Sequence, residues 1–195
     1  MTPLTMQAED LAILVVDVQP YFLDGWMAGA SEPLLARLEY LLGLATVYDL
    51  QCVATFEQPV AKKGRLPERL EPFFPAHGER YTKSSFDCCG EPAIREALAR
   101  LGRRQFAVAG GETDVCVLQS VLGLIGEGYQ VFLLEDCLFS SEPQVGPASR
   151  RWDRRSGGWN RLGWYPALSR PWATSCNDRS RRNRQRMSWQ RNAQS

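Results

Sequence analysis

Short apolar runs recur along the first 148 residues of the chain. Leu11–Val16 is a continuous apolar run rich in β-branched residues, which is typical of a strand buried on both faces of a parallel sheet. Similar runs recur at Cys52–Phe56, Phe106–Ala109 and Gln130–Leu134. The pattern therefore predicts four short strands.

Between these runs, apolar residues recur at helical spacing. Leucines and alanines lie three and four positions apart in Glu32–Tyr48, where Pro33 suits the first helical turn. Glu91–Leu101 and Thr113–Gly126 have the same periodicity. Val60–Tyr81 is rich in Lys, Pro and Gly, and we expect it to be a long surface loop.

The regular alternation of strands and helices indicates an α/β fold. We expect a three-layer αβα sandwich with a doubly wound, mostly parallel sheet. Ligands bind such sheets beyond the carboxyl ends of the strands. Asp17 follows the first strand and the turn Gly110–Cys116 follows another. These two distant segments are therefore predicted to meet at the same rim of the sheet.

The alternation stops after Ala148, and the charge changes with it. Residues 1–148 hold eleven Lys and Arg against twenty Asp and Glu, a net charge of −9, whereas residues 149–195 hold twelve Arg against two Asp, a net charge of +10. Five of the six tryptophans also lie in this last stretch. We therefore divide the chain into a domain at 1–148 and a basic, Arg- and Trp-rich tail at 149–195. The αβα fold is expected to be incomplete or altered after residue 148.

Two interpretations of the tail remain open. A natural basic tail with interleaved tryptophans would stack on nucleic-acid bases. Alternatively, out-of-frame translation of a GC-rich gene would yield the same excess of Arg, Gly, Trp and Ser. The abrupt loss of periodicity favours frameshifted or otherwise non-native sequence, so nucleic-acid binding is not expected.

The cysteines and the N-terminus bear on the cellular compartment. Six cysteines form no CxxC pair and no regular framework, as expected of a protein in a reducing environment. The first ten residues lack a positively charged region before an apolar run. Leu11–Val16 is too short to span a bilayer. We expect a cytoplasmic protein with no membrane contact.

Cys116 is the most informative candidate for chemistry. It lies one turn into the predicted helix that follows the Gly110-Gly111 turn, and Thr113 is a suitable N-cap. Unpaired N–H groups and the positive end of the helix dipole favour a thiolate at such a position. A buried structural cysteine is the alternative, because Val117 and Leu118 continue an apolar pattern.

Three segments, LAILVVDVQPYF, YTKSSFD and AGGETDVCV, contain Asp17, Lys83 and Cys116. In this order and combination they resemble the isochorismatase-like cysteine hydrolases, over about residues 10–142. The resemblance implies that Cys116 is the nucleophile, Asp17 the general base and Lys83 a cation that holds Asp17 and favours the thiolate. Without the resemblance, Asp17 would be an ordinary loop residue and Lys83 an ordinary exposed lysine.

The resemblance also assigns an oxyanion hole. It implies a cis peptide between Gly111 and Glu112, with the backbone N–H groups of Glu112 and Cys116 facing the developing oxyanion. A Gly-Gly turn that merely ends a strand is the alternative. GGETD is not a phosphate-binding loop, because it lacks the glycine spacing and the lysine of one.

The substrate pocket departs from that of the nicotinamidases of this family, which bind zinc through a TxDxH segment and a further histidine. The corresponding segment here is ATFEQP, and the only histidine is His77. We therefore expect no catalytic metal. The expected pocket residues are Phe22, Trp26, Glu57 and Gln58.

The resemblance implies a metal-independent cysteine hydrolase that cleaves a small amide-type C–N bond through a Cys116 thioester. Two alternatives remain open: an isochorismatase-type vinyl-ether hydrolase, and a catalytically silent binding or scaffold protein on the same fold. No cofactor is expected. Beyond a small-molecule substrate, the expected partners are further copies of the chain, as is common in the family.

Overall fold

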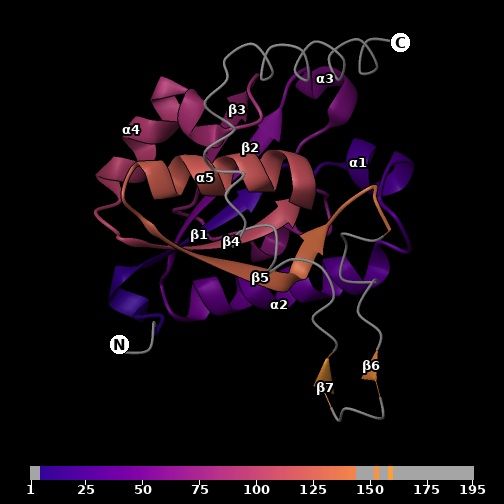
Figure 1. Ribbon diagram of the computed structural model, residues 1–195, viewed down its shortest axis with the longest axis horizontal. Coiled ribbons are helices and arrows are strands. Elements are labelled where there is room, and N and C mark those ends of the chain that lie inside the picture. The colour runs from indigo at the N-terminus through magenta and orange to yellow at the C-terminus, as the bar shows by residue number, and fades with distance from the viewer. Residues whose placement is uncertain (1–4, 144–151, 154–157, 160–195) are drawn as a thin grey trace. The chain divides into compact units, whose positions relative to one another are not determined.

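A five-stranded parallel sheet forms the centre of the structure (Figure 1). The computed structural model describes residues 5–143, 152–153 and 158–159. The strands lie in the order β3-β2-β1-β4-β5. In that order they span Glu79–Lys83, Gln51–Glu57, Leu11–Val16, Gln105–Gly111 and Gln130–Phe139.

The strand register determines which residues meet at the carboxyl rim of the sheet. Val16 at the end of β1 pairs with Thr55 of β2 on one side and with Gly110 of β4 on the other. Glu57 at the end of β2 pairs with Lys83 at the end of β3. Side chains at or just after these positions therefore share one edge of the sheet, as the sequence predicts.

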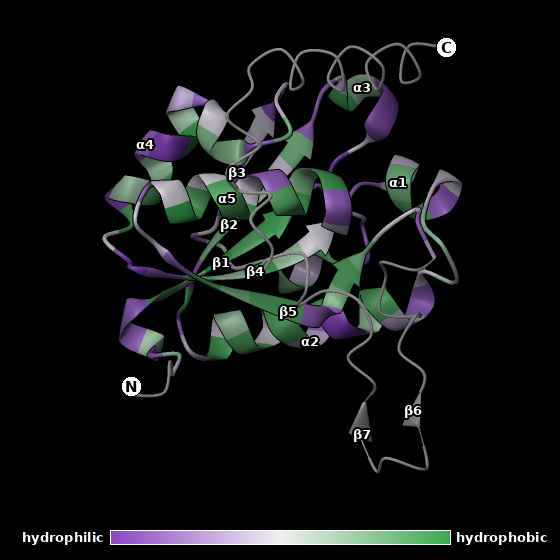
Figure 2. Cartoon of the chain, in the orientation of Figure 1, coloured by the Kyte–Doolittle hydropathy of each residue, from purple (hydrophilic) through white to green (hydrophobic). Residues whose placement is uncertain are grey.

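Helices cover both faces of the sheet, which confirms the predicted three-layer αβα sandwich (Figure 1). Leu11, Ile13 and Val15 of β1 belong to the apolar cluster that contains the buried leucines of α2 (Glu32–Val47). The alternate residues of β1 belong to a second cluster, with α4 (Pro92–Arg100) and α5 (Leu118–Gly126). Figure 2 shows β1 and β2 as largely hydrophobic, as expected for inner strands of a sheet covered on both faces.

Several short elements connect the strands and the long helices. They are the helices α1 (Pro20–Gly25) and α3 (Val60–Lys63), the 3₁₀ turns η1 (Ala8–Asp10), η2 (Glu71–Phe73) and η3 (Cys88–Gly90), and the π-helical turn η4 (Thr113–Val117). The prediction of one long loop over 60–81 is therefore wrong, because that range holds α3, η2 and the start of β3. α3 and η2 have only four and three residues, which is too short to produce a periodic pattern of apolar residues in the sequence.

Two predicted elements differ in their bounds. The helix expected over Thr113–Gly126 is the π-helical turn η4 followed by α5, which begins at Leu118. Thr113 is not the N-cap, because its hydroxyl donates to the carbonyl oxygen of Phe139 at 2.8 Å. β5 continues to Phe139 through a register shift against β4, past the predicted end at Leu134. A β-bulge of this kind leaves no signature in an apolar run.

The chain divides into two units, Met1–Ser149 and Arg150–Ser195. In the second, β6 (Trp152–Asp153) pairs with β7 (Gly158–Trp159) as a short antiparallel ladder, where the sequence showed no strand periodicity. The remaining expectations for the tail at 149–195 lie outside the described residues. Among the described helices, none combines the length and the apolar content that crossing a bilayer requires.

Candidate active site

Asp17 and Lys83 form a fully buried ion pair at the carboxyl rim of the sheet. Oδ2 of Asp17 lies 2.5 Å from Nζ of Lys83, and neither side chain is exposed. Burial alone would lower the pKa of Lys83, but the negative charges of Asp17 and its neighbours outweigh it and raise this pKa above the ordinary value. Lys83 is therefore positively charged at neutral pH and lies in the buried interior of the site.

The backbone and β2 hold the Asp17 carboxylate in place. Asp17 has a φ of 47°, in the left-handed region that Asp tolerates better than most residues. Its N–H donates to the carbonyl oxygen of Thr55 at 3.1 Å, and the Thr55 hydroxyl donates to Oδ1 at 3.0 Å. Both carboxylate oxygens are thus engaged, one by Lys83 and one by Thr55, and the side chain has little freedom to move.

Cys116 places its thiol beside two carboxylates. Sγ lies 4.0 Å from Oε2 of Glu57, and within 4.8 Å of a carboxylate oxygen of Asp17. The side chain projects from η4 and is 3% exposed. The structure therefore brings together Asp17, Lys83 and Cys116, which come from three separate segments of the chain.

The electrostatics of Cys116 differ from the sequence-based expectation of a favoured thiolate. Burial, and next to it the charge of Asp17, raise the pKa of the Cys116 thiol well above 9.0, while Lys83 lowers it in part. The position just before α5 does not compensate for the loss of hydration. The resting side chain is a neutral thiol, and a nucleophilic thiolate requires a base to remove the proton.

Glu57 and Lys63 form a second, largely buried ion pair next to the thiol. Nζ of Lys63 lies 2.9 Å from Oε1 of Glu57. The backbone of Glu57 is fixed by Gln19, whose amide oxygen accepts from the Glu57 N–H at 2.7 Å and whose amide nitrogen donates to the Gly64 carbonyl oxygen at 2.7 Å. These contacts hold the end of β2 against the segment that follows Asp17.

The turn after β4 approaches β1 closely. A Cβ at Gly110 would lie 2.0 Å from the carbonyl oxygen of Val16, and Gly110 has a φ of 111°, so both space and backbone conformation require glycine there. The peptide bond between Gly111 and Glu112 is cis. The turn leads directly into η4, so that the backbone of Glu112 lies one turn from Cys116.

The side chain of Glu112 is itself unusual. It is 8% exposed, its Oε1 has no hydrogen-bond partner among the described residues, and its Oε2 accepts from the Ser141 hydroxyl at 3.2 Å. Burial raises the pKa of Glu112 to about 7, and the nearby charges of Asp114 and Glu57 act in the same direction. A carboxyl group that is partly protonated at neutral pH thus lies beside the expected oxyanion hole.

The four expected pocket residues differ in how close they come to the thiol. Glu57 contacts it directly. Phe22 is connected through Lys63, whose Nζ lies 5.3 Å from the Phe22 ring centroid. Trp26 is 38% exposed and packs on a neighbouring tyrosine ring, and the contacts described for Gln58 are with its own loop and the Lys83 backbone. Of the four, Glu57 is the residue with a described contact to the thiol, and the role of the others in a pocket stays a prediction.

Asp17, Glu57 and Cys116 offer donor atoms close enough to hold a metal ion. Each carboxylate, however, is already paired with an ammonium group: Asp17 with Lys83 and Glu57 with Lys63. Two fixed positive charges at that distance oppose a further cation. His77 lies at the other end of β2, where Nε2 is 3.1 Å from the carbonyl oxygen of Leu50. The two carboxylates are therefore better explained as partners of Lys83 and Lys63 than as ligands of a metal ion.

Sequence reasoning missed several buried polar side chains of the site, namely Gln19, Thr55 and Lys63. Thr55 lies in an apolar strand, where a hydroxyl leaves no recognisable signal. Lys63 belongs to a Lys-rich stretch that looks solvated. For Gln19, the one available signal is that it lies two residues after Asp17 in the chain.

Comparisons with known proteins concern the family and the fold of the chain. The family model for the isochorismatase domain matches residues 11–149. Isochorismatase domain-containing protein 2 of Xenopus laevis is 33% identical over 101 residues, which is 49% of this chain and 48% of the relative. The chain therefore spans about half the length of this relative.

A longer match is to the probable hydrolase YcaC of Escherichia coli, 25% identical over 86% of this chain and 81% of the relative. The crystal structure of the E. coli YcaC product, described as an octameric hydrolase of unknown specificity, has a TM-score of 0.68 at 24% identity and covers 80% of this chain and 76% of that one. YcaC from Pseudomonas aeruginosa, solved with hexane-2,5-diol and covalent acrylamide, has a TM-score of 0.67 at 24% identity, covering 74% and 71%.

Proposed function

Since the chain belongs to the isochorismatase domain family, we propose that it is a cysteine hydrolase that cleaves a small amide-type C–N bond without a metal. Cys116 is the nucleophile, Asp17 the general base and Lys83 the cation that holds the base. The family and its hydrolase-named relatives support hydrolysis in general. The amide substrate and the role of each residue go beyond those relatives and are proposed from the resemblance and the geometry of the site.

The observation that carries the proposal is the buried Asp17–Lys83 pair within reach of a neutral thiol. A fully buried ion pair costs free energy in desolvation and is seldom stabilising by itself. A carboxylate oxygen of Asp17 lies within 4.8 Å of the Cys116 sulfur, which supports a role for the pair in accepting the thiol proton. The raised pKa of the Cys116 thiol creates the need for a base that Asp17 meets.

In the first half-reaction, the proton of the Cys116 thiol passes to Asp17 and the sulfur attacks the substrate carbonyl carbon. The carbonyl oxygen becomes an oxyanion that the backbone N–H groups of Glu112 and Cys116 stabilise. The C–N bond then breaks, and the leaving amine takes the proton from Asp17. The products of this step are a free amine or ammonia and a thioester on Cys116.

In the second half-reaction, Asp17 removes a proton from a water molecule that attacks the thioester carbonyl carbon. The C–S bond breaks, the carboxylic acid leaves, and the proton on Asp17 returns to the sulfur. Lys83 stays positively charged throughout and favours the thiolate whenever it forms. Glu57, held by Lys63, faces the same space and would orient a polar group of the substrate.

Substitution of the nucleophile and the base tests the mechanism. The full chain would be assayed on small amides, carbamoyl compounds and isochorismate-like vinyl ethers, with Cys52→Ala as the matched control because Cys52 is a buried cysteine within β2. We expect Cys116→Ala and Asp17→Asn to abolish amide hydrolysis and Cys52→Ala to retain it. We also expect rapid quenching of the wild type to trap an acyl group on Cys116.

Other outcomes separate the alternatives. Amide hydrolysis that persists in Cys116→Ala would refute the covalent scheme. Turnover of vinyl ethers alone, lost in Asp17→Asn but retained in Cys116→Ala, would assign isochorismatase-type chemistry. Binding without turnover for every substrate class would favour a catalytically silent protein.

Self-association is part of the proposal. The E. coli relative is described as octameric, and α2 of this chain carries exposed Tyr40 and Val47 at 68% and 76% exposure, next to exposed Tyr48. Exposed apolar side chains of this size are common at interfaces between copies. We expect light scattering coupled to size exclusion to give a mass above that of the 22.0 kDa chain; a monomer at all concentrations would contradict this.

The compartment is also proposed. The described cysteines, at 52, 88, 89, 116 and 137, are free and buried, which suits a reducing environment such as the cytoplasm. Cell fractionation of the expressed chain would check this, since recovery in an oxidising compartment would contradict it.

A further inference from the structure

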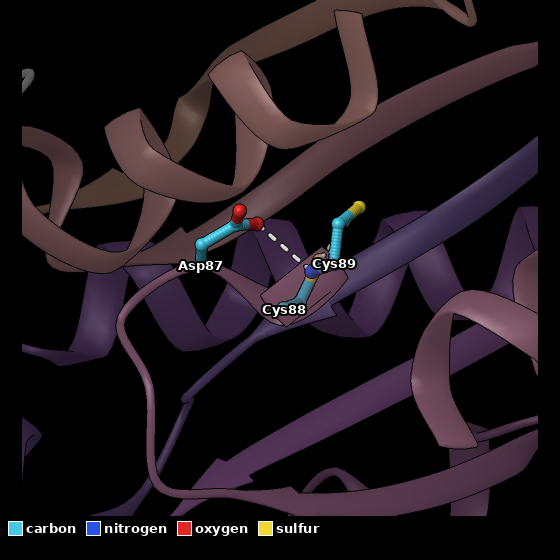
Figure 3. Close-up of side chains that lie close together, drawn as sticks. All are labelled: Asp87, Cys88 and Cys89. Carbon is cyan, nitrogen blue, oxygen red and sulfur yellow. Dashed lines mark hydrogen bonds between the residues drawn. The ribbon is translucent and has the colours of Figure 1, made fainter. Parts of the chain in front are cut away.

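Asp87, Cys88 and Cys89 form a cluster of metal-type donors that the proposed hydrolysis does not use. Their donor atoms lie within 4.8 Å of one another, and they come from the loop after β3 and the turn η3 (Figure 3). Cys88 is 0% exposed and Cys89 is 5% exposed. The cluster shares no residue with Asp17, Lys83 and Cys116.

We propose that Asp87, Cys88 and Cys89 bind one thiophilic divalent cation of the zinc class. Two thiolates and a carboxylate are donors that zinc accepts, and three protein ligands leave a fourth position for water. This site is independent of the proposed hydrolase mechanism.

The distance between the two sulfurs fits such an ion. Sγ of Cys88 lies 3.9 Å from Sγ of Cys89. Two sulfurs at the usual zinc–sulfur bond length of about 2.3 Å and a tetrahedral angle are separated by about 3.8 Å. Binding therefore requires almost no change in the distance between the sulfurs.

A disulfide between the same sulfurs fits less well. The Cα atoms of adjacent residues across a trans peptide are about 3.8 Å apart, below the range of about 4.4–6.8 Å that disulfides span. The two sulfurs would also have to approach from 3.9 Å to about 2.05 Å. The separation seen here favours ligation over oxidation.

The carboxylate is held in position from two sides. Oδ1 of Asp87 accepts from the Cys89 N–H at 2.8 Å, the bond drawn in Figure 3. This bond caps η3 with one oxygen, and a metal ion would take the other. A Cβ at Gly123 of α5 would lie 2.2 Å from Oδ1 of Asp87, so the glycine leaves the space that the carboxylate fills.

The backbone of the cluster is also fixed. The Cys88 N–H donates to the Ser120 hydroxyl at 3.1 Å, and that hydroxyl donates to the carbonyl oxygen of Phe86 at 3.3 Å. The Ser85 hydroxyl donates to the carbonyl oxygen of Asp87 at 2.6 Å. Because these bonds already order the loop against α5, little conformational entropy is lost when an ion binds.

The charges around the cluster suit a bound dication. Two thiolates and one carboxylate carry three negative charges, which a divalent ion would reduce to one. Arg95 acts on Asp87 in the same direction as a cation and Glu127 in the opposite one, while Lys83 is already paired with Asp17.

The test uses the full chain, reduced and stripped of metal by a chelator. Titration with Cd²⁺ should produce the ultraviolet thiolate-to-metal absorption band with one equivalent bound, and competition of Zn²⁺ against a chromophoric chelator should give the affinity. We expect Cys88→Ser or Cys89→Ser to weaken binding more than 100-fold, beyond the roughly 10–100-fold loss that removal of a supporting residue costs. Cys116→Ser tests the other donor cluster, and Cys176→Ser a cysteine outside the described residues; neither should change the affinity.

A matched pair of glycine variants tests the geometry without touching a ligand. Gly123→Ala would push on the Asp87 carboxylate, whereas a Cβ at Gly126, in the same helix, would meet nothing within 4 Å. We expect Gly123→Ala to weaken Zn²⁺ binding by about 10-fold or more and Gly126→Ala to leave it unchanged. Equal affinities for the two variants would contradict the assigned position of the carboxylate.

A measurement on the wild type covers the case in which the cysteine variants do not fold. Zn²⁺ should protect Cys88 and Cys89, but not Cys116, from alkylation as mapped by mass spectrometry of the digested protein. Failure to bind either ion, loss of binding in Cys116→Ser or Cys176→Ser, or protection confined to Cys116 would overturn the proposal. Since no step of this test requires catalysis, its failure is distinct from failure of the hydrolase mechanism.

Discussion

Replacing Glu112 with glutamine should stabilise the protein at alkaline pH. Glu112 is buried beside the cis peptide, and its Oε1 has no hydrogen-bond partner among the described residues. Burial raises its pKa to about 7 from an ordinary value of 4.5. The folded state therefore holds the carboxyl proton more tightly than the unfolded state does.

The sign and size of the effect follow from this difference. Between pH 4.5 and about 7 the unfolded state has lost the proton that the folded state keeps, so the free energy of unfolding falls as pH rises. The difference between the two pKa values, 4.5 and about 7, corresponds to about 3 kcal/mol of free energy. The side chain of Glu112 keeps some contact with solvent, which screens part of this, so we expect about 2 kcal/mol of destabilisation above pH 7. The neutral amide of Glu112→Gln avoids that cost.

Urea unfolding of wild type and Glu112→Gln at several pH values between about 5 and 8 would measure this difference. We expect equal stability near pH 5 and about 2 kcal/mol more for Glu112→Gln near pH 8. Glu68→Gln is the control, since Glu68 is exposed, and it should follow the wild type throughout. A Glu112→Gln curve parallel to the wild type at every pH would refute the reasoning, because it would mean that Glu112 is ionised in the folded state at little cost.

Three further predictions concern the site. Lys83→Met should leave Asp17 buried without its counter-ion and lower the free energy of unfolding by about 3–5 kcal/mol near neutral pH, measured by urea unfolding. Gly110→Ala should cost about 1–3 kcal/mol because its Cβ would lie 2.0 Å from the carbonyl oxygen of Val16, and a thermal melt no lower than that of the wild type would contradict this. Alkylation of Cys116 by iodoacetamide should still accelerate about tenfold per pH unit between about pH 7 and 9, because burial raises the thiol pKa well above 9.0; a plateau below pH 8 would indicate a stabilised thiolate.

Most of the sheet could be predicted because each inner strand is apolar on both faces. β1 begins and ends at the predicted residues, and the predicted parts of β2 and β4 extend by one or two residues at each end. β3 could not be predicted, because its residues alternate between partly exposed and exposed before the buried Lys83, and its sequence reads as loop. Edge strands carry the polar residues that remove the signal.

The site could be predicted as far as it depends on chain position. Asp17 and Lys83 each lie at or just after the carboxyl end of a strand, so a parallel sheet brings them to one rim. The ion pair between Glu57 and Lys63 could not be predicted, because it depends on the short helix α3 turning a lysine back toward the end of β2. A Lys-rich stretch without periodicity does not indicate which lysine is buried.

The protonation state of Cys116 was beyond sequence reasoning for a different reason. The start of a helix favours a thiolate, and that contribution is visible in the sequence. Burial of the same atom and the neighbouring carboxylate of Asp17 favour the thiol, and they prevail. The balance depends on distances that no local pattern contains. Because the thiol is neutral at rest, the proposed mechanism needs Asp17 to generate the nucleophile as well as to activate water. Under that proposal, Asp17→Asn should impair the formation of the thioester and not only its hydrolysis.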